Sequence, residues 1–207
     1  MAITFTQLKT RLEEWTENTA TEYTGTVSEF IRLGQQRMER ELGALEAFRA
    51  ASTLTTTQAT VALSTQAVRI LWIKNQGGDY LQRKDESFIR EFVPSATYFG
   101  TPRFYAYTAA ATQIIVAPTP SQSLTFDYGY QQRLAALSTT ASTNWLTDYA
   151  ENAFTFCCML AAYKTFLKPE QADVDRMEQL YEQEKAWLIK EELEKKKTDE
   201  FRTPELP

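Results

Sequence analysis

Catalytic chemistry in this 207-residue chain would rest on carboxylates, because the chain contains no histidine. Without histidine there is no His-based nucleophile triad, no imidazole acid–base catalyst and no imidazole-bound metal. Two carboxylates held at a fixed separation are nevertheless sufficient to hydrolyse a glycosidic bond. Most of the candidates lie beside turn residues or bases, so solvated ion pairs are the simpler interpretation and we predict that the protein is not an enzyme. These candidates, all in the middle of the chain, are Asp79, Asp85, Glu86, Glu91 and Asp127.

The cysteines and glycines also lack the spacing of a catalytic or cofactor site. Cys157 and Cys158 are adjacent within an apolar run, which suits neither a disulfide framework nor a zinc cluster. We expect two buried free thiols in a reducing compartment. The seven glycines form no phosphate-binding loop and no nucleophile elbow. The sequence therefore predicts neither a cofactor nor a metal ion.

The charge of the chain argues against tight binding to nucleic acid. The chain contains 22 Lys and Arg and 27 Asp and Glu, which gives a net charge of −5. Between Glu170 and Pro207 there are 12 of the acids and 7 of the bases. An acidic chain without a basic stripe lacks the counterion release that dominates affinity for DNA. Passage of duplex DNA without specific binding is compatible with this charge, because a wall that repels phosphate does not retain the duplex.

No segment of the sequence has the features of a membrane span or of a secretory signal peptide. The first residues lack the basic and apolar regions of a signal peptide, and no apolar run reaches the ~18 residues of a bilayer span. The 43% hydrophobic, 13% aromatic and 24% charged residues are typical of a globular protein. We therefore expect a folded protein that does not cross a membrane.

The first 50 residues carry the pattern of two helices. Thr4 and Gln7 have the spacing of a capping box, and apolar residues follow them at helical intervals. Thr26 and Glu29 repeat the capping-box spacing, so the second helix is expected to begin at Thr26.

Short alternating runs of Thr, Val, Ile and Tyr begin at Thr53 and are typical of strands. Gly77-Gly78 predicts a hairpin turn, and a short helix is expected at Glu86 to Phe92, before Pro94. The expected strands are 53–57, 60–63, 68–74, 79–83, 103–107, 113–116 and 123–130. Eight aromatic residues either pack a thin core, which we favour, or form a ligand platform: Tyr98, Phe99, Phe104, Tyr105, Tyr107, Phe126, Tyr128 and Tyr130.

Helical periodicity returns in the last third of the chain. Asp148 as N-cap, with Glu151 at N3, predicts a helix that is apolar on nearly every side and hence buried. Pro169 opens a long helix that is expected to reach Lys197. Two prolines follow, so residues 198–207 are expected to form an extended tail. The apolar stripe of the long helix is expected to comprise Val174, Met177, Leu180, Tyr181, Trp187 and Leu188.

Together these patterns predict an α+β fold, a mainly helical bundle from both chain ends with an inserted small antiparallel β unit. Residues 1–50 and 138–197 are expected to form the helical domain, and residues 51–137 the β domain. Residues 198–207 are the expected C-terminal tail.

An ordered series of motifs resembles the head-to-tail adaptor (connector) proteins of tailed bacteriophages. Gly100 and Pro102 precede aromatic residues, and the apolar run 114–120 ends in Pro-x-Pro. The strand 126–130 then ends near a tyrosine, and Asn-Trp-Leu at 144–146 enters the buried helix. These motifs cover residues 97 to 190, and the order of elements covers the whole chain.

The resemblance implies a structural virion protein of the neck or tail, assembled in the cytoplasm of the bacterial host. It implies a homo-oligomeric, twelve-fold ring that binds the portal protein above and a tail or neck protein below, with a channel for DNA ejection. The C-terminal segment docks on the portal in such adaptors. The resemblance therefore assigns portal binding to Phe201, Arg202, Pro204, Leu206 and Pro207.

Other functions stay open at this point. A tail-side neck component, either a stopper or a tail terminator, would bind the end of a tail tube instead of the portal. A host-surface binding module would use the Tyr-rich β unit. A His-free carboxylate hydrolase would depend on residues such as Asp127 or Glu86.

Overall fold

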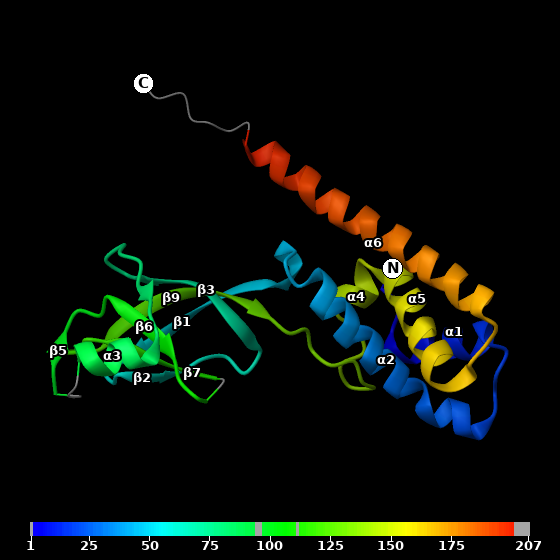
Figure 1. Ribbon diagram of the computed structural model, residues 1–207, viewed down its shortest axis with the longest axis horizontal. Helices are drawn as coiled ribbons and strands as arrows, with labels where there is room; N and C mark the ends of the chain where they lie inside the picture. The colour runs from blue at the N-terminus through cyan, green and yellow to red at the C-terminus, as the bar shows by residue number, and fades with distance from the viewer. Residues whose placement is uncertain (1, 94–96, 111, 201–207) are drawn as a thin grey trace. The chain divides into compact units, whose positions relative to one another are not determined.

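A computed structural model describes residues 2–93, 97–110 and 112–200 of the chain. The fold is α+β, as predicted, and it divides into two compact units (Figure 1). The helical unit is built from the chain up to Phe48 and again from Leu134 onward, and the β unit is Arg49–Arg133. The β unit is thus an insertion between two helical segments.

The first helix, α1 (Phe5–Trp15), begins at the predicted capping box. The Thr4 hydroxyl accepts from the Gln7 backbone N–H at 3.3 Å, and the Gln7 carboxamide oxygen accepts from the Thr4 N–H at 2.9 Å. These two bonds satisfy N–H groups that have no partner within the helix. Glu17, with φ 50°, lies in the left-handed region just after the helix ends.

The second helix, α2 (Thr21–Leu42), begins five residues before the predicted start. Thr26 lies inside the helix, where its hydroxyl donates to the Tyr23 carbonyl at 2.8 Å, so it caps nothing. The chain turns at Glu17, and the Asn18 carboxamide accepts from the Ala20 N–H at 3.0 Å. Because this local turn already directs the chain into the helix, the capping-box pattern at Thr26 is not used.

The helix α5 (Glu151–Ala162) lies buried against α2, and the short helix α4 (Trp145–Asp148) precedes it. The prediction that Asp148 caps the buried helix was wrong. Asn144 caps α4 instead, accepting from the Leu146 N–H at 3.0 Å, while the Thr147 hydroxyl accepts from the Asn144 N–H at 2.8 Å. This reciprocal box satisfies the start of α4, and α5 follows Ala150 without a side-chain cap.

Close packing of α2 on α5 depends on Gly34. A Cβ at this position would lie 2.7 Å from the Cys158 sulfur and 3.2 Å from the Cys158 Cα. Both cysteines are buried free thiols, as predicted, and the Cys157 thiol donates to the Gly34 carbonyl at 3.6 Å. Gln35 on the same helix is also buried, and its carboxamide donates to the Ala135 carbonyl at 3.2 Å. The chain returning from the β unit is therefore held against α2 by hydrogen bonds.

The last helix, α6 (Gln171–Glu200), is the longest in the described chain and extends along the bundle (Figure 1). It follows a π-helical turn, η2 (Tyr163–Leu167), and Lys168 in the left-handed region. It runs three residues beyond the expected end at Lys197, because no proline or glycine interrupts it there. None of the helices in the described ranges combines the length and the hydropathy needed to cross a membrane.

One sheet of the β unit has the order β1-β9-β3, with β9 (Leu124–Gln132) between β1 (Arg49–Thr56) and β3 (Ala67–Asn75). Both pairings are antiparallel, and two register shifts interrupt β3. Alternate residues of β9, Phe126, Tyr128 and Tyr130, face the core of the β unit.

The second sheet has the order β2-β7-β6-β4: β2 (Thr60–Ala62), β7 (Gln113–Ala117), β6 (Phe104–Tyr107) and β4 (Gln82–Arg83). A separate pair joins β5 (Phe99–Gly100) to β8 (Thr119–Pro120). The pairings β4–β6 and β5–β8 are short and parallel, whereas the longer ones are antiparallel. The helix α3 (Glu86–Phe92) has the predicted bounds.

The hairpin predicted at Gly77-Gly78 is a turn, in which Gly78 has φ 99° and donates to the Asn75 carbonyl at 2.9 Å. The expected strand 79–83 is only partly formed. A single bridge joins Lys74 to Tyr80, and pairing resumes at Gln82 with β6 of the other sheet. The segment changes sheets between these points, which a pattern of alternating residues does not reveal.

The eight aromatic residues of the β unit divide between core and surface. The core interpretation holds for Tyr105, Phe126, Tyr128 and Tyr130, which are buried. It is wrong for Tyr98 and Phe99, whose exposed fractions are 57% and 58%. These two side chains lie at the start of the short β5–β8 pair, where no layer of the described unit covers them.

Candidate functional site

The carboxylates considered for catalysis lie in separate elements of the β unit. Asp79 follows the turn after β3, Asp85 and Glu91 belong to the region of α3, and Asp127 lies in the middle strand β9. Glu86 accepts from Arg90 one helical turn away, at 2.5 Å. Among the described residues no three His, Cys, Asp or Glu side chains gather as a metal site would require.

The residues predicted to bind the portal fall beyond the described part of the chain. Phe201, Arg202, Pro204, Leu206 and Pro207 all follow Glu200, the last described residue. The structural question is therefore how α6, the element that leads to them, is held by the helical unit.

A seam with a spacing of seven residues attaches α6 to the bundle. Val174, Tyr181 and Leu188 are buried, and Met177 packs partly buried against the same core. Residues seven apart lie on nearly the same line along a helix, so α6 contacts the bundle through a narrow stripe. Side chains on the other faces of α6 are left for other contacts.

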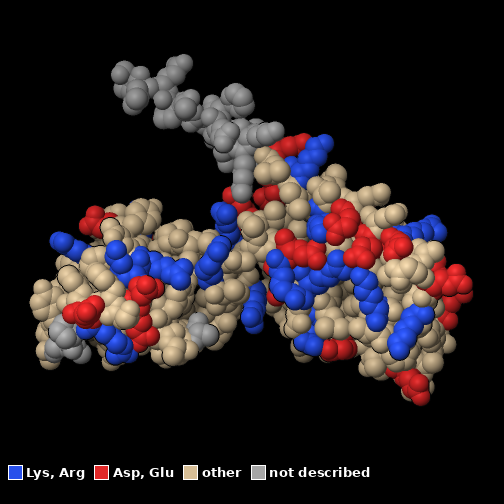
Figure 2. Space-filling view, viewed as in Figure 1, with Lys and Arg blue, Asp and Glu red and all other residues tan. Residues whose placement is uncertain are grey.

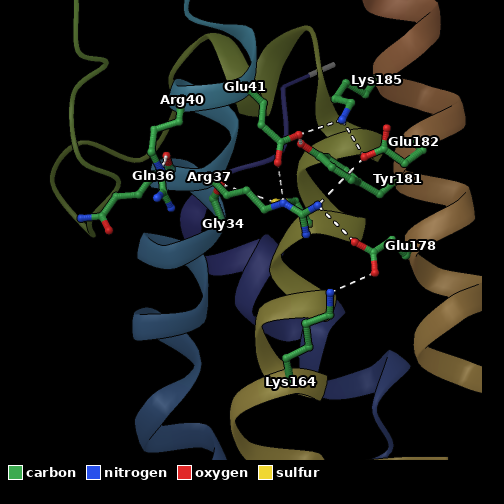
Figure 3. Close-up of polar contacts among 11 residues, drawn as sticks. Gly34, Gln36, Arg37, Arg40, Glu41, Lys164, Glu178, Tyr181, Glu182 and Lys185 are labelled. Carbon is green, nitrogen blue, oxygen red and sulfur yellow. Dashed lines mark hydrogen bonds and ion pairs between the residues drawn. The ribbon is translucent and has the colours of Figure 1, made fainter. Parts of the chain in front are cut away.

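A polar cluster beside Tyr181 reinforces this seam (Figure 3). Arg37 of α2 donates to Glu41 at 2.7 Å and to Glu178 of α6 at 3.4 Å, and its guanidinium lies 4.7 Å from the centre of the Tyr181 ring. Lys164 of η2 also reaches Glu178, at 2.9 Å. The cluster therefore joins α2 to η2 and α6, which are distant from α2 in sequence.

Glu41 is the centre of the cluster. Its carboxylate accepts from the Tyr181 hydroxyl and from the Lys185 ammonium, each at 2.8 Å, as well as from Arg37. Burial raises the pKa of the Glu41 carboxyl, but the hydrogen bonds from Arg37, Lys185 and Tyr181 outweigh burial and hold that pKa at about 2. Glu41 is therefore ionised in the folded state at neutral pH.

The thiol next to this cluster, Cys157, is buried. Burial raises the pKa of Cys157 to about 12, although Arg37 nearby opposes this rise. A thiol with such a pKa is protonated at neutral pH. The polar cluster thus joins α2 to α6 beside a protonated thiol.

Beyond Lys185 the helix exposes large apolar side chains. The exposed fractions are 57% for Trp187, 53% for Leu193 and 36% for Ile189. Trp187 was expected in the buried stripe, and this was wrong, because Leu188 occupies the seam position instead. The spacing of Val174, Tyr181 and Leu188 is the signal in the sequence that distinguishes the two neighbours.

Contacts with Tyr149 hold the segment of α6 after Lys185 against the bundle. The Tyr149 hydroxyl donates to Glu191, and Lys195 lies 4.9 Å from the centre of the Tyr149 ring. Tyr149 follows α4, the helix capped by Asn144. The helical unit therefore holds α6 as an arm as far as Lys195 and leaves part of its apolar surface uncovered.

The described part of α6 is thus an anchored arm with uncovered apolar side chains. The model of the family described as SU10 adaptor protein matches residues 3–204. The chain belongs to the SU10 adaptor protein family. This is a phage head-tail adaptor family, so the resemblance drawn from the sequence is confirmed.

Membership makes this SU10 adaptor protein a structural component of a phage virion. It implies partners among the head and tail proteins of the phage in general. An adaptor family is structural, which favours a protein without enzyme activity. Comparison with curated proteins gives no match.

Proposed function

We propose that this adaptor protein forms a homo-oligomeric ring between the portal and the tail or neck of the phage, with a central channel for the passing DNA. The observation that carries the proposal is the family match over residues 3–204, together with the anchored α6 arm. The ring is twelve-fold, and duplex DNA passes without specific binding. The net charge of −5 supports passage without retention.

The α6 arm and the residues that follow it bind the portal in this proposal. The anchor around Glu41 fixes the direction of α6, and the uncovered Trp187 and Leu193 supply apolar contacts. Phe201 and Leu206 add apolar side chains further along the sequence. Arg202, Pro204 and Pro207 complete the contact segment.

The test is to mix the purified protein with portal rings of the same phage and to measure the mass and symmetry of the product. We expect a closed ring stacked coaxially on the portal, while the free protein runs beside it as the reference. Association with the end of a tail tube, and none with the portal, would contradict the proposal and indicate a stopper or tail terminator.

Two variants locate the contact within the C-terminal segment. Phe201→Ala with Leu206→Ala removes the apolar side chains, and we expect portal binding to weaken by at least tenfold, since buried anchors dominate such contacts. Thr198→Ala with Glu205→Ala changes the same segment without removing an apolar anchor, and binding should stay near that of the unaltered protein. If both variants bind the portal as tightly as the unaltered protein does, this segment does not dock on the portal.

A further inference from the structure

The sheet β1-β9-β3 has a second face, opposite the core of the β unit. The register places Arg49, Gln131 and Arg69 in one row across the three strands. The next row on that face is Ala51, Gly129 and Trp72, and the third is Thr53, Asp127 and Lys74. The hydroxyls of Thr55 and Thr125 meet at 2.9 Å in the row that follows, which confirms the common face.

Trp72 lies across the middle of this face. A Cβ at Gly129 would lie 2.3 Å from the Trp72 ring nitrogen, so the indole rests directly on the backbone of β9. Beside it is an open groove of about 480 Å³, lined by Arg49, Ala50, Ala51, Leu71, Trp72 and Gly129. Exposed fractions of 37% for Trp72 and 36% for Leu71 show that no described layer of the β unit covers the groove.

The face has the composition of a protein contact surface with a positive charge. Its bases are Arg49, Arg69 and Lys74, and Asp127 is the acid in the same rows. Tyr80 extends the aromatic surface, since its ring centre is 6.3 Å from that of Trp72. Tryptophan and arginine are the side chains that most often dominate binding energy at interfaces.

Figure 2 shows Lys and Arg as well as Asp and Glu on the visible surface of both units, and their numbers in the sequence give the two units opposite net charges. Arg49–Arg133 contain eight Lys and Arg against five Asp and Glu, a net of +3, so the remainder of the chain carries −8. Each copy of the protein therefore has a basic β unit and an acidic helical unit.

Acidic residues are concentrated at the α1–α2 end of the helical unit. Between Arg11 and Arg32 the chain has five Glu and neither Lys nor Arg. Within the described chain, no ion pair includes Glu13, Glu14, Glu17 or Glu22, and the last three are exposed. Trp15 in the same segment has an exposed fraction of 47% and offers an apolar side chain beside the acids.

We propose that the open face of the β1-β9-β3 sheet binds the acidic α1–α2 end of the helical unit of a second copy of this chain. The bases on the face meet Glu14 and Glu17, and the groove beside Trp72 receives an apolar side chain. Such a contact joins two different patches, so its repetition from copy to copy gives a ring when the rotation between neighbours closes, as the proposed ring requires. This inference rests on the proposed ring and names the contact between its neighbours.

The same face is poorly suited to duplex DNA. A surface that binds the phosphate backbone needs a continuous series of bases. Here the middle row is Ala51, Gly129 and Trp72, and Asp127 stands next to Lys74 in the third row. The neutral middle row and the acid favour a protein partner.

Charge reversal tests the contact from both sides. The sheet variant carries Arg69→Glu and Lys74→Glu, and the helix variant carries Glu14→Lys and Glu17→Lys. Each should weaken ring formation on the portal by at least tenfold, because like charges then face each other between neighbours. Arg103→Glu is the matched control, since Arg103 lies outside the three-stranded sheet, and its rings should form as those of the unaltered protein do.

The decisive measurement mixes the two defective variants in equal amounts. In a ring of even copy number they can alternate, and every contact then joins one positive patch to one negative patch, so ring formation should return to within about threefold of the unaltered protein. Circular dichroism and melting curves of each variant alone establish that both are folded.

The outcomes separate this inference from the function on which it rests. Failure of the unaltered protein to assemble on the portal overturns both. Normal rings from the sheet variant, or no recovery on mixing, overturn the proposed contact and leave the adaptor function standing. A sheet variant that forms rings but no longer retains DNA would identify DNA as the occupant and would also overturn the proposal.

Discussion

The two units of the adaptor differ in where most of their phenylalanines lie. In the helical unit Phe154 and Phe30 are buried in one large core. In the β unit Phe88 and Phe92 stack at 5.8 Å on the surface, with exposed fractions of 37% and 51%. Phenylalanine therefore mainly fills the core of the helical unit, whereas several phenylalanines of the β unit lie on its surface.

This difference indicates that the two units of the adaptor have different roles. The helical unit fixes α6 through a deep seam and the cluster at Glu41, so it acts as a rigid support. The β unit has a thinner core and leaves Trp72, Tyr98 and Phe99 on its surface. Proteins that expose several large apolar side chains together generally bind a partner with them.

The largest expected effect is that of Phe154→Ala in the helical core. It should lower the free energy of unfolding by about 3–5 kcal/mol, because the substitution leaves a cavity in a packed interior. Phe92→Ala in the β unit is the matched change and should cost only about 1 kcal/mol, the contribution of an exposed aromatic pair. Urea titrations measure both values. Equal losses would abolish the contrast between the units.

Tryptophan fluorescence can assign these losses to a unit. Trp72 is the only tryptophan of the β unit, and Trp15, Trp145 and Trp187 lie in the helical unit. In a Trp72→Phe background the emission therefore reports only on the helical unit, where Phe154→Ala should move the urea midpoint. Phe92→Ala should leave that midpoint unchanged.

The next effect contrasts two glycines of the same helix. Gly34→Ala should lower the free energy of unfolding by about 1–3 kcal/mol, because its Cβ would press on the Cys158 sulfur. Gly25→Ala meets no atom within 4 Å and should raise stability by about 0.5–1 kcal/mol, since alanine favours the helix. Thermal melts of both variants check the signs. A neutral Gly34→Ala would show that α5 can move away from α2.

A further effect tests the role of the anchor around Glu41. Glu41→Gln should lower the free energy of unfolding by about 2 kcal/mol at pH 7, because it weakens charged hydrogen bonds to α6. The folded-state pKa of about 2 lies below the ordinary 4.5, so the Glu41 contribution is complete above pH 4.5 and disappears as the pH falls through 2.

The pH dependence of unfolding is the measurement for this prediction. Between pH 4.5 and pH 2 the stability of the unaltered protein should fall more steeply than that of Glu41→Gln. Glu22→Gln, an exposed change on the same helix, should keep the steep fall and cost less than about 0.5 kcal/mol. Parallel curves for all three proteins would show that Glu41 does not anchor α6.

Much of the fold was predictable from local signals. The capping box at Thr4 and the helix Glu86–Phe92 were found correctly, because each signal acts within one turn of the chain. The starts of α2 and α4 were missed, because the capping-box pattern at Thr26 is not used and because Asn144, not Asp148, supplies the cap. The adaptor resemblance came from the order of motifs, and the family match confirms it.

The sequence by itself determined that this protein has two helical segments around a β insertion, no histidine chemistry and an acidic C-terminal helix. Periodicity and composition are sufficient for these features, since they are local properties of the chain. Only the tertiary structure decided that Gly34 meets Cys158 where α2 packs on α5, and that Trp72 lies on Gly129 across an open sheet face. Those choices depend on which residues distant in sequence become neighbours, and the register and packing of the folded chain fix them.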